Sequence, residues 1–145
     1  MILFSSALEP TLEKRKIMNK LIMNIANEKI FLMIITKDDI YNITKENTKI
    51  NYEKLTLILI DFLNSNNMRL EDIQKIYVNR GPGSFAAIRN TLSIVKAINV
   101  ARKIDYYCYS LEDFKDQKDI KYEDIPNLCD KFKIKKNLIK PIYLS

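Results

Sequence analysis

Residues 76–89 read IYVNRGPGSFAAIR and join three kinds of local pattern in a short space. The residues before the glycines are β-branched and aromatic, which favours a strand over 75–78. The residues after them place apolar side chains at helical spacing, which predicts a helix over 86–102. A second β-rich run follows at 105–109. A strand, a helix and a further strand in this order predict parallel pairing with a right-handed crossover.

The turn between this strand and this helix holds both glycines of the chain. Average usage near 7% would give a chain of this length about ten. One interpretation is a tight turn that needs positive φ or close backbone approach. The other is an anion site at the start of the helix, although the lysine of a phosphate-binding loop and the spacing of a dinucleotide fingerprint are both missing. The predicted glycine turn comprises Arg80, Gly81, Pro82, Gly83, Ser84 and Phe85.

The residues before this unit predict a hairpin and a helix. Apolar runs at 21–25 and 30–36 flank a turn at Asn27 and Glu28, and a weaker strand is expected over 39–44. Residues 51–64 read as a helix with Asn51 as its N-cap. We therefore expect an α/β fold with a mixed sheet, in which an antiparallel hairpin precedes parallel strands flanked by helices.

The middle of the predicted helix, residues 55–63, is apolar nearly all the way round. A helix covered on one side only should show a stripe instead. The helix is either buried within its own domain or used between molecules. We favour the intermolecular interpretation, because a chain of 145 residues has little material to cover it.

Composition excludes several kinds of chemistry. The chain has no histidine, which rules out Ser-His and Cys-His nucleophile pairs and the H-E-x-x-H zinc site. Cys108 and Cys129 are too few and too far apart for a disulfide framework or a paired-cysteine zinc site. The net charge of +6 comes from dispersed Lys and Arg residues, and a solvated basic surface explains it better than a dedicated RNA site.

Neither a membrane span nor a secretion signal is expected. The longest apolar stretches, at 30–35 and 55–60, are far shorter than the roughly 20 residues that cross a bilayer. The first residues have neither a basic start nor a cleavage site. We expect a cytoplasmic protein.

The glycine turn and its surroundings resemble one known family. Residues 79–89 are similar to the GRGPGSFTGLR-type signature of TsaB proteins, which belong to the actin/Hsp70/sugar-kinase-like superfamily. Residues 92–101 and 109–112 are similar to the family's next helix and its V-S-S-L-E segment. Residues 18–28 resemble its first strand and turn, and residues 141–144 its C-terminal P-x-Y-L. The resemblance implies a single actin-like, ribonuclease H-like lobe. Residues 1–17 would be an extension, 18–114 the TsaB-like N-terminal lobe, and 115–145 a short remnant of the second lobe with a C-terminal tail.

The sequence departs from the family pattern in three ways. Asn24 stands where the family has a strand-end aspartate, so we expect a degenerate phosphate position there. Ala86 and Ala87 replace a Thr-Gly pair after Phe85. Most of the second lobe is missing. These departures predict a protein with no catalytic residue, no metal and no cofactor, an inactive paralogue of the threonylcarbamoyl transferase subunit.

The resemblance implies a function in partnership. TsaB proteins bind and stabilise the catalytic subunit TsaD, which makes N6-threonylcarbamoyladenosine at position 37 of tRNA. We expect the same partner, a homodimer when the protein is isolated, and tRNA contact only through the complex. The alternatives are a degenerate ATPase or glycoprotease-like peptidase, or a direct tRNA-binding module. The predicted interface lies on the two helices and comprises Leu55, Ile58, Leu59, Phe62, Ile88, Thr91, Ile94, Val95 and Ile98.

Overall fold

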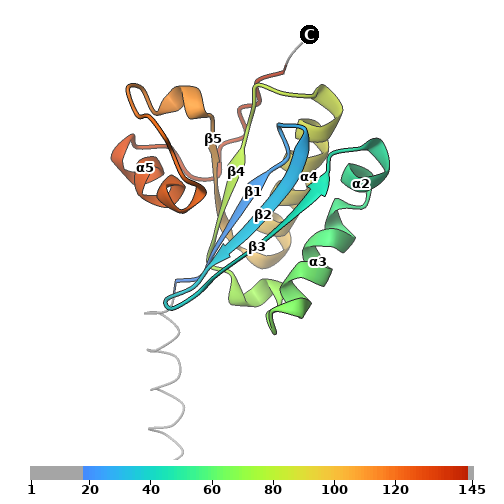
Figure 1. The fold of residues 1–145 in the computed structure, drawn as a ribbon. Helices are drawn as coiled ribbons and strands as arrows, with labels where there is room; N and C mark the ends of the chain where they lie inside the picture. The colour runs from blue at the N-terminus through green and yellow to red at the C-terminus, as the bar shows by residue number, and fades with distance from the viewer. Residues whose placement is uncertain (1–17, 144–145) are drawn as a thin grey trace, which may run out of the picture.

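A computed structural model describes residues 18–143, and the predicted extension over residues 1–17 lies outside them. A five-stranded sheet with the order β3-β2-β1-β4-β5 forms the centre (Figure 1). β1 pairs antiparallel with β2, and β2 with β3, while β1–β4 and β4–β5 are parallel. The mixed sheet and its leading hairpin are as predicted. The strands are β1 (Lys20–Asn24), β2 (Lys29–Ile35), β3 (Ile40–Glu46), β4 (Lys75–Asn79) and β5 (Asp105–Tyr109).

The region predicted as one helix over 51–64 forms two, because the chain breaks at Lys54. The N-cap is Thr48 and not Asn51: the Thr48 hydroxyl accepts a hydrogen bond from the Asn51 backbone N–H at 3.2 Å. None of the helices over residues 18–143 is long and apolar enough to cross a membrane. The helices are α2 (Lys49–Glu53), α3 (Leu55–Ser65), α4 (Phe85–Arg102) and α5 (Ile125–Lys131), with 3₁₀ turns η1 (Leu70–Asp72), η2 (Leu111–Asp113) and η3 (Tyr122–Asp124).

The larger core lies between one face of the sheet and helices α3 and α4. α3 places Leu55, Leu59 and Phe62 in this core, all at most 4% exposed. As expected, the chain does not bury this helix on all sides: its inner side packs in this core, whereas Leu57 and Ile60 on its outer side are 63% and 37% exposed. The buried side chains of α4 are Ala87, Ile88, Thr91, Leu92, Val95 and Ile98.

The opposite face of the sheet is covered by residues that follow β5. They fold back over the sheet and include α5 (Figure 1). Phe114, Ile125 and Leu128 pack there against Ile22 and Tyr77 in a second core. Both sides of the boundary predicted at residue 114 therefore contribute to the same core. The origin of residues 115–145 as a remnant of a second lobe stays a prediction.

Candidate functional site at the strand ends

Asn24 and Asn79 end the parallel strands β1 and β4, where α/β folds place their ligand sites. Both side chains are buried. The Asn79 amide donates to Asn24 Oδ1 at 3.3 Å, and Ala26 N–H donates to the same oxygen at 3.1 Å. The Asn24 amide donates to the Tyr122 hydroxyl at 2.8 Å. The side chain at the predicted degenerate phosphate position is thus hydrogen-bonded to other groups of the same chain.

Tyr122 belongs to the segment that covers the second face, and the sequence did not indicate its role. Its ring stacks on Phe31 with centroids 4.0 Å apart and planes 19° apart. This stacking fixes the hydroxyl above the end of β1. Among residues 18–143, no group of three or more His, Cys, Asp or Glu side chains could hold a metal ion.

The two glycines are explained by backbone that approaches them closely. Gly81 has φ of +115°, and a Cβ added there would lie 2.1 Å from the Ile142 carbonyl oxygen. A Cβ on Gly83 would lie 2.5 Å from the Ala26 carbonyl oxygen. Gly81 N–H donates to Asn79 Oδ1 at 2.9 Å, and the Ser84 hydroxyl caps α4 by accepting from Ala87 N–H at 3.5 Å. The tight-turn interpretation accounts for both positions without an anion.

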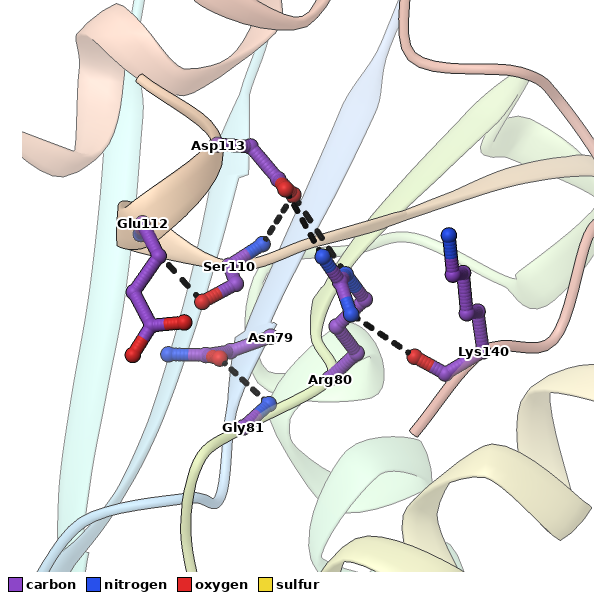
Figure 2. A network of polar contacts seen from close by, with 7 residues as sticks. All are labelled: Asn79, Arg80, Gly81, Ser110, Glu112, Asp113 and Lys140. Atoms are coloured by element: carbon purple, nitrogen blue, oxygen red, sulfur yellow. Dashed lines mark hydrogen bonds and ion pairs between the residues drawn. The ribbon is translucent and has the colours of Figure 1, made fainter. Parts of the chain in front are cut away.

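Arg80 connects the glycine turn to two other segments (Figure 2). Its Nη2 lies 2.7 Å and its Nε 3.3 Å from the two Asp113 oxygens, a bidentate pair. Its Nη1 donates to the Lys140 carbonyl at 3.0 Å. Asp113 Oδ2 also accepts from Ser110 N–H at 2.8 Å, in a capping box at the start of η2. Arg80 therefore holds together the turn, η2 and the C-terminal segment.

The structure places most of the predicted interface residues inside the subunit. Ile58 and Ile94 are partly buried, and the other seven are buried. A face built from those seven would need the core to open, so they are not surface residues. The large apolar side chains that α3 and α4 do expose are Leu57 (63%), Ile60 (37%), Phe85 (51%) and Val100 (62%). Their spacing relative to the buried residues is the signal that would have identified them.

The two cysteines have no features of a reactive site. Cys108 and Cys129 are both free and buried. Burial raises the pKa of each thiol to about 12. The thiol form therefore prevails at neutral pH, whereas a cysteine nucleophile needs a lowered pKa.

These features define an α/β lobe with a mixed five-stranded sheet, in which the chain's own side chains occupy the ends of the central strands. The predicted resemblance to the TsaB family is confirmed by two kinds of comparison. Residues 46–110, from the end of β3 to the start of η2, match the model of the family TsaD: tRNA N6-adenosine threonylcarbamoyltransferase. No curated protein matches the chain in sequence.

Solved structures show the same fold. YeaZ from Pseudomonas aeruginosa is similar over 64% of this chain and 44% of its own, with a TM-score of 0.60 and 17% identity. A second structure, described as an uncharacterized protein with similarity to peptidase YEAZ from Pseudomonas aeruginosa, has the same score and identity over 64% and 43%. The chain thus spans less than half the length of these structures. At this identity the likeness establishes the fold.

Proposed function

We propose that the protein is a TsaB-like, non-catalytic subunit that binds and stabilises a TsaD catalytic subunit in the threonylcarbamoylation of tRNA. The observation that carries this proposal is a set of exposed apolar side chains on the outer sides of α3 and α4, two helices that lie within the segment that matches the TsaD family. We call Leu57, Ile60, Ser93, Ala97 and Val100 the two-helix face.

The two-helix face has the chemistry of a helix-packing surface. α3 and α4 bury their inner sides in the same core, and the Asn90 amide joins α4 to the Tyr52 carbonyl of α2 at 2.5 Å. On α4 the exposed Ser93 and Ala97 are small, which lets a second helix approach closely. Ser93 and Ala97 line a groove of about 600 Å³ together with the apolar residues Leu92, Val100, Ile139 and Tyr143, and the basic residues Arg89 and Lys96 also border it. Exposed apolar surface of this kind favours association.

A role without catalysis is supported by the groups around Asn24. A metal–phosphate site uses carboxylates, whereas Asn24 is a neutral amide with three hydrogen bonds to Ala26, Asn79 and Tyr122. We infer that the isolated protein hydrolyses neither ATP nor peptides. Turnover assays test this inference, and a rate that persists through repurification and is lost in one point variant would contradict it.

The partner proposal is tested by pull-down with TsaD and by light scattering of the protein alone. We expect a complex with TsaD and a homodimer of the isolated protein, because a twofold pair hides the same face. Leu57→Glu and Val100→Glu should each weaken both associations at least tenfold. Leu111→Glu is the matched control, since Leu111 is 52% exposed but lies on η2, outside the two-helix face. A monomer that binds no TsaD, or equal losses in the control, would refute the proposal.

A further inference from the structure

The positive charge of the chain is concentrated in one segment. Residues 131–140, here called the basic strap, contain five lysines and no acidic residue, and so account for five of the six net positive charges. The rest of the chain is nearly neutral. The prediction that the positive charges are dispersed along the sequence is therefore wrong for this segment. The lysines are Lys131, Lys133, Lys135, Lys136 and Lys140, and all are exposed.

The backbone of the basic strap is fixed at several points although its lysines are exposed. Ile134 N–H donates to the Cys129 carbonyl at 2.9 Å, and Asn137 N–H donates to the Tyr106 carbonyl at 2.7 Å. The Asn137 side chain accepts from Tyr106 N–H and donates to Asp105, at 3.0 and 2.9 Å. Arg80 holds the Lys140 carbonyl (Figure 2). Fixed backbone lowers the entropy lost when a ligand binds.

Three of the lysines surround one hollow. Lys133, Lys135 and Lys140 line a pocket of about 250 Å³ together with Arg80 and Asp113. Arg80 and Asp113 neutralise each other as a pair. Within residues 18–143, only Lys136 of the five strap lysines forms an ion pair, at 3.7 Å from Asp105. The hollow therefore has about three uncompensated positive charges, which suits a polyanion.

We propose that the basic strap binds the phosphate backbone of RNA directly, around the hollow lined by Lys133, Lys135 and Lys140. Clustered lysines on one surface are the electrostatic footprint of nucleic-acid binding. The preceding residues, 112–130, contain seven carboxylates and three lysines. Their negative charge confines the contact to the strap and leaves the segment over the second sheet face free of RNA.

The identification of the RNA as tRNA rests on the proposed function. The subunit would then contact the substrate of the complex directly. An unmodified tRNA transcript is titrated with the full chain between 50 and 200 mM salt. Replacing Lys133, Lys135 and Lys140 by Gln should weaken binding at least tenfold. It should also reduce the slope of log K against log salt by roughly 2 to 3, because each phosphate contact contributes about 0.7 to 0.9. Replacing the same residues by Arg should preserve both quantities.

A control variant with three substitutions removes the same amount of charge at positions outside the strap. Lys37, Lys45 and Lys118 are exposed and lie outside the strap, so their replacement by Gln should leave most of the affinity intact. Equal losses in both triples, an unchanged salt slope, or binding to phosphatidylserine vesicles in place of tRNA would overturn the inference. A strap variant that loses TsaD but keeps tRNA would also overturn it. Wild-type protein that binds tRNA through the strap but binds no TsaD would contradict the proposed function alone.

Discussion

The side chain of Asn24 donates a hydrogen bond of 2.8 Å to the hydroxyl of Tyr122, a residue 98 positions further along the chain. The bond joins the end of the first strand to the segment that covers the second face of the sheet. Removing the hydroxyl in Tyr122→Phe leaves a buried amide without this partner and should lower the free energy of unfolding by about 1–2 kcal/mol. Thermal or denaturant unfolding measures the change.

Tyr106 provides the opposite case and serves as the control. Its hydroxyl is buried and has no hydrogen-bond partner among the described residues. Tyr106→Phe removes an unsatisfied polar group, so it should be neutral or stabilise the protein by up to about 1 kcal/mol. If this variant loses as much stability as Tyr122→Phe, the two hydroxyls do not differ in hydrogen bonding as described.

The glycine turn should not tolerate side chains. In Gly81→Val the new atoms meet the Ile142 carbonyl, and the φ of +115° is unfavourable for a β-branched residue. Gly83→Val meets the backbone of Ala26. Each change should destabilise the fold by roughly 3 kcal/mol or more. Ala86→Val, at an exposed position of α4, should cost well under 1 kcal/mol. Unchanged melting of both glycine variants would show that the turn has no special geometry.

The Arg80–Asp113 pair should be structural. Asp113→Ala leaves the guanidinium, whose side chain is 11% exposed, without its carboxylate, and should cost about 2–3 kcal/mol. Glu112→Ala next to it is the control, because the Glu112 carboxylate forms no ion pair within residues 18–143. Chemical denaturation of the two variants separates the outcomes, and equal stabilities would argue against the pair.

Stability should decrease in alkaline solution. Burial raises the pKa of Cys108 and Cys129 to about 12, whereas unfolded thiols titrate near 8.5. The unfolded chain therefore loses these protons first, the folded state binds more protons above that pH, and the free energy of unfolding falls as pH rises toward 12. Unfolding curves between pH 8 and 10 measure the effect. Cys129→Ala should be less stable at pH 8 but should show a shallower decline, and an unchanged slope would contradict this explanation.

The two sides of α3 should respond differently to charge. Leu59 is 1% exposed and packs in the core, so Leu59→Glu should unfold the protein. Leu57 is 63% exposed two positions earlier, and Leu57→Glu should melt within a few degrees of wild type. Circular dichroism distinguishes the two variants. A folded Leu59→Glu protein would mean that the inner side of α3 is not part of the core.

Local patterns predicted the strands well, because each is a short apolar run bounded by polar residues. They did not predict the helix break at Lys54 or the N-cap at Thr48. α2 buries none of its residues, so its first turn leaves no apolar pattern in the sequence. Burial of Leu59 was missed because a run that is apolar on every side does not show which side faces the sheet. The contact between Asn24 and Tyr122 depends on how an irregular segment folds back, and no local signal encodes that path.

The attachment of Asn137 to β5 also protects an edge of the sheet. β5 is the last strand of the sheet, and Lys136 and Asn137 pair with the side of it that faces away from β4. Without this pairing, the strand Asp105–Tyr109 would have an open edge of the kind that recruits strands from other chains. The strap therefore also shields the edge of the sheet from association with other copies of the protein.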